Sequence, residues 1–276
     1  MRTGWHVSRS VPSSRVGHSW RQDRRVGWLC VPRVHGGGTS ARCPRRGLPM
    51  STLDVVSPHI RGLGLAAAAG PAAFLIGWAI GAATQHGFRI LRDGESALAA
   101  VGADHPWITM TGDTLLGIGM IALAVALVAL LNGTGRAVGC LLLAIAGFCT
   151  IIQALVREDC VADLGLCAAA GRSDATTWRQ PVHDSTNAIA FVATLAAAFV
   201  LAGPLRRHGW QTLARLATAS GAVGLVLLVV YIPLSDSAVG GLAEFLFFLV
   251  ALAWTALLGL RIAGRLKLDA DRRPGP

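Results

Sequence analysis

The stretch MTGDTLLGIGMIALAVALVALL at residues 110–131 decides the fold, because it is long and apolar enough to cross a bilayer as one helix. A helix needs about 20 mostly apolar residues to cross about 30 Å of hydrocarbon. Only structures that pair their backbone groups internally, such as helices, survive in that medium. Five more stretches of this kind follow or precede it, which predicts an all-α fold: a polytopic six-helix transmembrane bundle over residues 62–262. The predicted spans are 62–84, 110–131, 135–156, 184–204, 212–232 and 240–262.

The charges between the spans alternate from one side of the predicted membrane to the other. From Met50 onward, one side carries ten Arg and Lys against three acids, and the other carries five Arg against eleven acids. Cytoplasmic flanks of membrane helices are enriched in Arg and Lys, so we predict that the basic side is cytoplasmic. Six crossings then give a multi-pass protein of the cell membrane with both termini in the cytoplasm. The two long connections, about 85–109 and 157–183, are predicted to be external.

The leading segment differs from the rest of the chain in composition. Residues 1–49 hold ten Arg and one Asp, and so account for +9 of the net charge of +10. The segment is rich in Gly, Pro, Ser and Arg and lacks apolar periodicity, which predicts a disordered basic cytoplasmic tail over 1–61. Three alternatives stay open: a targeting peptide, a patch for anionic lipid or nucleic acid, and a start codon assigned too early, with translation beginning at Met50. A second basic cytoplasmic tail is predicted at 263–276.

Three acidic residues mark the external ends of predicted spans. Asp113, Asp184 and Glu244 each lie in or beside the first turn of a helix, where a carboxylate stabilises the helix dipole by about 0.3–1 kcal/mol. Capping of this kind is the favoured explanation. The alternative is a shared metal or proton site, for which the candidate metal ligands are Asp113, His183 and Glu244. No ionisable residue lies at the middle of a predicted span, which argues against a proton-coupled pump.

The second external connection contains the only two cysteines predicted to lie outside the membrane on that side. Cys160 and Cys167 are seven residues apart and face an oxidising compartment, so a disulfide between them is the expected state. Metal coordination by the two thiolates is the lesser alternative, because zinc sites typically use a C-x2-C spacing.

Several short motifs lie in and between the predicted spans. They are RDGESALAAVGADHPWITMTGDTLLGIGMIALAVAL (92–127), CVADLGLC (160–167), PVHDSTNAIAF (181–191) and GGLAEF with a later AW (240–254). Together they resemble the bacterial membrane proteins grouped as domain of unknown function 998. The resemblance implies a six-helix architecture and no biochemistry, and the sequence departs from the family pattern at Ala97 and Phe245. The family positions fall on Ser96, Asp163, Gly165, His183, Glu244 and Trp254.

Two classes of function follow from these observations, and whether the protein is an enzyme is left open. The favoured class is a non-enzymatic bundle, either transporter-like or an accessory protein of the cell envelope. The alternative is a membrane-embedded, metal-dependent hydrolase with an outward-facing catalytic site made of Ser96, Asp163 and His183. The expected partners are the lipid bilayer and a lipid or small-molecule ligand, with no nucleic acid. The sequence leaves the cofactor, the substrate and the oligomeric state open.

Overall fold

The computed structural model describes residues 57–171, 176–235 and 237–266, and within them it contains six long helices and no strand. This confirms the predicted all-α, six-helix architecture. All six helices are long and apolar enough to cross a membrane. Residues 1–56 of the tail expected over 1–61, and residues 267–276 of the expected C-terminal tail, lie outside the described residues, whereas residues 58–61 belong to the first helix. The long helices are α1 (Pro58–Thr84), α2 (Pro106–Leu130), α3 (Thr134–Leu155), α5 (Arg179–His208), α6 (Gln211–Leu234) and α7 (Gly240–Ile262).

Local sequence signals fix several helix ends. Ser57 caps α1, since its side chain accepts a hydrogen bond from the Ile60 N–H, and Pro58 follows at a position where proline is favoured. A proline, Pro106, also begins α2, although the preceding His105 makes no capping hydrogen bond with its side chain. Gly209 ends α5 with a φ of 96°, a left-handed conformation that suits glycine. Helices α2 and α5 therefore begin four and five residues earlier than hydropathy alone predicts.

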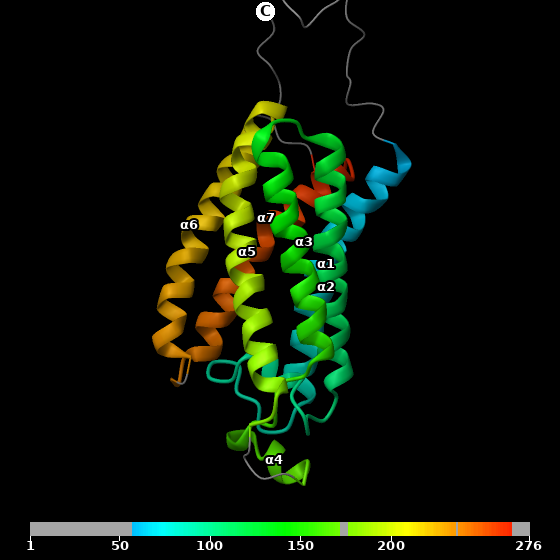
Figure 1. The fold of residues 1–276 in the computed structure, drawn as a ribbon. Coiled ribbons are helices and arrows are strands. Elements are labelled where there is room, and N and C mark those ends of the chain that lie inside the picture. The colour runs from blue at the N-terminus through cyan, green and yellow to red at the C-terminus, as the bar shows by residue number, and fades with distance from the viewer. Residues whose placement is uncertain (1–56, 172–175, 236, 267–276) are drawn as a thin grey trace, which may run out of the picture. The chain divides into compact units, whose positions relative to one another are not determined.

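The six long helices form a closed ring, visible in Figure 1. Each of them packs against its neighbour in chain order, and α7 returns to pack against α1. Helix α6 is the most peripheral, because only 17% of its most apolar window is buried. Large apolar side chains such as Val226, Val229 and Ile232 are exposed on α6. An outward-facing apolar surface of this kind is what lipid contact requires.

Glycines allow the helix backbones of this ring to approach closely. A Cβ atom added to Gly117 on α2 would lie 2.5 Å from the carbonyl oxygen of Gly147 on α3, and the converse distance is also 2.5 Å. Gly64 on α1 and Gly259 on α7 make a similar contact. Small residues commonly mediate such packing in membranes, where no hydrophobic force drives helices together.

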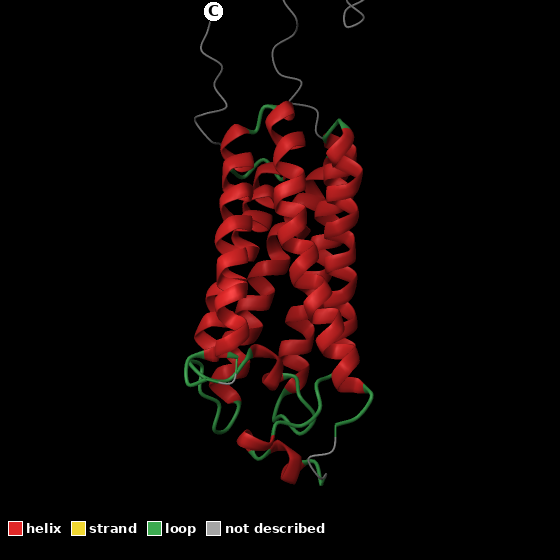
Figure 2. Ribbon diagram, turned by 60° about the vertical axis from the view of Figure 1, so that its left-hand side comes forward, coloured by secondary structure: helices red, strands yellow, loops and turns green. Residues whose placement is uncertain are grey.

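The longer connections gather at one end of the bundle, as Figure 2 shows. We call this the loop end, and it comprises the connections 85–105 and 156–178 together with the adjoining turns of the helices. Short elements lie within these connections: η1 (Glu95–Leu98) in the first, and η2 (Ala162–Leu164) and α4 (Leu166–Ala169) in the second. Among the described residues, the connections between helices at the opposite end are the short turns around 131–133 and 209–210.

Candidate functional site

The first connection closes the loop end by docking onto the start of α7. The N–H of Gly241 donates to the Arg92 carbonyl at 3.0 Å, and the N–H of Leu242 donates to the Leu91 carbonyl at 3.0 Å. Two of the N–H groups that lack partners at a helix start are thereby satisfied. A Cβ atom at Gly241 would lie 2.5 Å from the Asp93 carbonyl oxygen, so only glycine permits this close contact.

The second connection is fastened to the first by hydrogen bonds and an ion pair. The Val101 N–H donates to the Glu158 carbonyl at 3.1 Å, and the Arg157 guanidinium donates to the carbonyls of Ala99 and Ala100. Arg92 of the first connection forms an ion pair with Asp163 of the second. The two connections therefore form one cap, although they are separated in sequence by α2 and α3.

A disulfide joins Cys160 to Cys167 within this cap. The bond closes the turn that contains η2 and so holds the segment carrying Asp163. Cys140 and Cys149 are free thiols buried within α3, where they act as small apolar residues.

We expect the disulfide to be present in the native protein, and its removal to loosen the cap. A disulfide that closes a loop of this size stabilises the folded protein by about 2–3 kcal/mol. The double substitution Cys160→Ser/Cys167→Ser should therefore increase hydrogen exchange in 156–171, while exchange within α2 and α3 stays unchanged. Peptide mapping under non-reducing conditions checks the bond directly. Finding both cysteines as free thiols in the native protein would contradict the expectation.

Two of the three acidic residues expected to cap helices lie deeper than the first turn. Helices α2 and α5 begin earlier than hydropathy predicts, and their first turns contain no acidic residue, so the capping explanation is wrong for Asp113 and Asp184. Glu244 is the fifth residue of α7, beside the first turn as predicted. Asp184 is exposed and bonded to Gln180, whereas the side chains of Asp113 and Glu244 are only 3% exposed.

Glu95 on η1 joins Glu244 in the interior of the loop end. The backbone N–H of Glu95 donates to Oε2 of Glu244 at 2.9 Å, and the Glu95 side chain is only 2% exposed. Burial raises the pKa of Glu95 well above its ordinary value, and the neighbouring carboxylates of Asp113, Glu244 and Glu158 raise it further. In the described part of the chain, no Arg or Lys forms an ion pair with any of these four acids. Among the described residues of the loop end, three buried acids (Glu95, Asp113 and Glu244) and the half-buried Glu158 therefore have no ion pair with a basic residue.

His183 lies one turn into α5 and is also buried. Its Nδ1 donates to the Val156 carbonyl at 3.0 Å, because a carbonyl can only accept. In the neutral ring this hydrogen bond leaves Nε2 as an acceptor, and Nε2 is buried without a partner among the described residues.

The structure does not connect the three residues of the expected catalytic site. Ser96 is half-buried on η1, Asp163 is exposed and paired with Arg92, and His183 is bonded to Val156. Over the described ranges, no hydrogen bond connects any two of Ser96, Asp163 and His183. Over the same ranges, no hydrogen bond joins His183 to Glu244 either.

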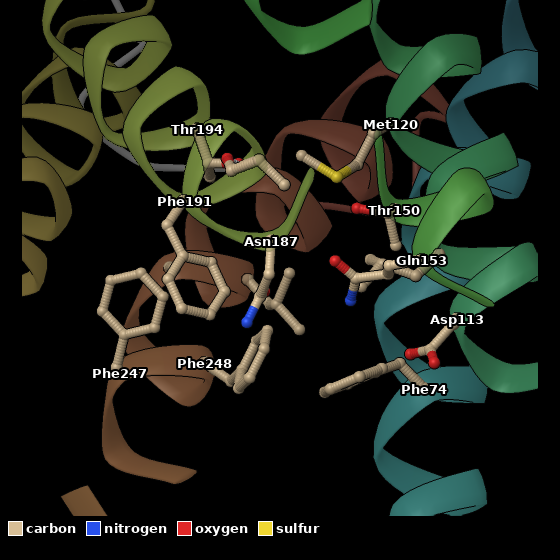
Figure 3. Close-up of a pocket in the computed structure, with 14 residues that line it drawn as sticks. Phe74, Asp113, Met120, Thr150, Gln153, Asn187, Phe191, Thr194, Phe247 and Phe248 are labelled. Atoms are coloured by element: carbon tan, nitrogen blue, oxygen red, sulfur yellow. Dashed lines mark hydrogen bonds between the residues drawn. The ribbon is translucent and has the colours of Figure 1, made fainter. Parts of the chain in front are cut away.

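An internal cavity lies next to this acidic cluster, and Figure 3 shows the side chains around it. We call it the chamber. It has a volume of about 20 Å³, which is enough for an occupant the size of water. Five helices contribute to its walls, and α6 does not. The polar lining residues are Asp113, Thr150, Gln153, Asn187 and Thr194, and the aromatic ones are Phe74, Phe191, Phe247 and Phe248.

Three side-chain oxygen atoms at the chamber accept no hydrogen bond from the described residues. Oδ1 of Asp113, Oε1 of Gln153 and Oδ1 of Asn187 are all buried without a partner among the described residues. Figure 3 shows the side chains of Gln153 and Asn187 at the chamber, with Asp113 beside Phe74. Buried polar groups are normally hydrogen-bonded, so three unpartnered acceptors around one cavity indicate a place for a bound species.

Sequence reasoning named Asp113 but missed Gln153, Asn187 and Glu95. A criterion based on ionisable residues at mid-span does not detect the amides of Gln153 and Asn187, which lie within apolar helices. A polar amide in such a helix is itself a signal, because its burial requires a partner. The position of Asn187, one helical turn beyond His183, was a further signal.

The expected metal ligands Asp113, His183 and Glu244 do not form a coordinating group in this structure. Within residues 57–171, 176–235 and 237–266, no three His, Cys, Asp or Glu side chains are arranged so that they could hold a metal ion. Thiolate coordination by Cys160 and Cys167 is not available either, because these residues form the disulfide.

A comparison with known protein families gives a match that covers nearly the whole six-helix bundle. A family model described as "Protein of unknown function (DUF998)" matches residues 68–261, which run from α1 to the end of α7. No curated protein and no solved structure matches the chain.

Proposed function

The chain belongs to the DUF998 family, and we propose that this multi-pass membrane protein is a non-enzymatic, transporter-like bundle whose chamber receives a small solute. The chamber with its unpartnered oxygens is the observation that carries the proposal. Its lining begins at Asp113, about 10 Å along α2 from Pro106 at 1.5 Å per residue. It extends to Met120, Thr194 and Leu252, which lie near the middles of their helices. A cavity at this depth serves a solute that enters the bundle.

The contacts of the cap favour this function over hydrolysis. A hydrolytic site requires a nucleophile or activated water, a base and an orienting group within hydrogen-bond reach of one another. The Asp163 carboxylate is held by Arg92, His183 is bonded to the Val156 carbonyl, and no hydrogen bond among the described residues joins either of them to Ser96. The residues that do converge on one space are the polar and aromatic side chains of the chamber.

Entry of solutes into proteoliposomes tests the proposal. We expect the protein to accelerate osmotic swelling with at least one of glycerol, urea, ammonium chloride and sodium chloride. Ala251→Val should abolish the acceleration, since Ala251 is buried and lines the chamber. The matched control is Ala253→Val on the same helix, because Ala253 is exposed. Swelling equal to that of protein-free liposomes with all four solutes, or equal swelling with the two variants, would contradict the proposal.

We further propose that the loop end faces the exterior and that both termini are cytoplasmic. The charge asymmetry supports this orientation, since Arg136, Arg206 and Arg207 lie at the end opposite to the acidic cap. A reporter active only outside the cytoplasm should give a signal when inserted near Ala170 and none when fused after Arg273. The reverse pattern of signals would show that the topology is inverted relative to this proposal.

A further inference from the structure

We propose that the chamber binds a water-sized monovalent cation, held between the carboxylate of Asp113 and the side-chain oxygens of Gln153 and Asn187. The inference rests on the proposed function, because it names the class of solute that the same chamber receives. Ammonium, sodium and potassium share the required chemistry, and the experiment below distinguishes them.

When it is ionised, the Asp113 carboxylate requires a partner that the described residues do not provide. The side chain is 97% buried, as only 3% of it is exposed, and its Oδ1 is buried without a hydrogen bond. In the described part of the chain, no ion pair or hydrogen bond reaches this carboxylate. A buried carboxylate is stable as an anion only when it is paired or coordinates a cation. A cation from solution supplies what is missing.

Other oxygens in the chamber can also serve as ligands for a cation. Gln153 is 6% exposed, and its Oε1 has no donor within the described ranges; the same holds for Oδ1 of Asn187. The Thr150 hydroxyl donates to the Ala146 carbonyl at 2.9 Å, which leaves its oxygen free to accept. Carboxylate, amide and hydroxyl oxygens are ligands for hard cations and acceptors for the N–H groups of ammonium.

The size and the walls of the chamber restrict the cation further. A volume of about 20 Å³ suits an occupant close to water in size. Asp113 is the only lining residue with a carboxylate, which matches a single positive charge. Divalent ions usually need several carboxylates or retained waters. The rings of Phe74, Phe191 and Phe248 also line the chamber, and aromatic faces attract cations.

Thermal stability of the purified protein at constant ionic strength tests the inference. Sodium, potassium or ammonium chloride replaces N-methylglucamine chloride stepwise, because N-methylglucamine is a monovalent cation too large for the chamber. We expect a saturable rise in the unfolding midpoint with at least one small cation, as binding to the folded state requires. Asp113→Asn should weaken the apparent affinity by about 100-fold. Asp184→Asn, which removes an exposed carboxylate at the same end, should leave the affinity unchanged.

Gln153→Leu provides a second test that keeps the carboxylate, and it should weaken binding by about tenfold. The inference is overturned if no small cation raises the unfolding midpoint above its value in N-methylglucamine chloride. It is also overturned if Asp113→Asn and Gln153→Leu both bind the cation with the affinity of the wild type. Saturable cation binding without any solute entry in proteoliposomes would overturn the proposed function and support the inference. Entry of glycerol or urea without cation binding would support the proposed function and overturn the inference.

Discussion

Gly64→Ala is expected to lower the free energy of unfolding by about 1–3 kcal/mol, the usual cost of overpacking a well-packed contact. A Cβ atom at Gly64 would lie 2.7 Å from the backbone nitrogen of Ala263 and 2.8 Å from the carbonyl oxygen of Gly259. Both atoms belong to backbone near the end of α7, so neither can move aside as a flexible side chain would. The substitution must push α1 and α7 apart, and this contact closes the helix ring.

Gly62→Ala is the matched control for this prediction. Gly62 lies two residues earlier on the same helix, and nothing lies within 4 Å of the position of its Cβ. Alanine favours a helix interior by about 1 kcal/mol over glycine, so this variant should be as stable as the wild type or more stable. Thermal unfolding in detergent, followed by circular dichroism, compares the two. Equal midpoints for Gly62→Ala and Gly64→Ala would show that α1 and α7 do not approach as closely as described.

Glu95→Gln is expected to stabilise the protein at neutral pH. Burial and the nearby carboxylates raise the pKa of Glu95 well above its ordinary value of 4.5. One unit of pKa shift corresponds to about 1.4 kcal/mol, so we expect a gain of at least about that size at pH 7. The amide of glutamine carries no charge, and its N–H groups can donate to the surrounding carboxylates. Thermal unfolding midpoints of both proteins between about pH 4 and pH 7.5 provide the measurement.

The sign of the pH dependence follows from proton binding in the two states. Above pH 4.5 the unfolded chain has released the Glu95 proton while the folded protein still holds it. The unfolded state then binds fewer protons, so the Glu95 contribution to stability falls as pH rises toward the folded-state pKa. The advantage of Glu95→Gln should therefore grow from about pH 4.5 upward and be smallest below it. A variant less stable than the wild type at pH 7, or an advantage independent of pH, would contradict this account.

The architecture could be predicted from the sequence because a bilayer imposes length and apolarity on every span. All six predicted spans correspond to observed helices, and α7 has the predicted bounds of 240–262. The starts of α2 and α5 could not be read from hydropathy, because the helices continue beyond the apolar core into polar segments. Pro106 and Arg179 begin these helices, so Asp113 lies two turns inside α2 instead of capping it.

The chamber was only partly predictable, because hydropathy does not reveal which face of an apolar helix points inward. Asp113 was recognised as a candidate from its charge alone. Gln153 and Asn187 face the same cavity from α3 and α5, and only the packing of these helices against their neighbours brings the amides together. Glu95 lies in a connection, where a charged residue is ordinarily solvated. Its burial depends on the docking of the first connection onto α7 through the contact with Glu244.

A crystal structure of the protein grown with rubidium or thallium as the monovalent cation tests the central claim most directly, since both ions scatter anomalously. The account predicts an anomalous peak inside the chamber, in contact with Oδ1 of Asp113 and with the side-chain oxygens of Gln153 and Asn187. The peak should be missing from crystals of Asp113→Asn grown under the same conditions. A wild-type chamber without a peak, or a peak of equal height in Asp113→Asn, would contradict the account.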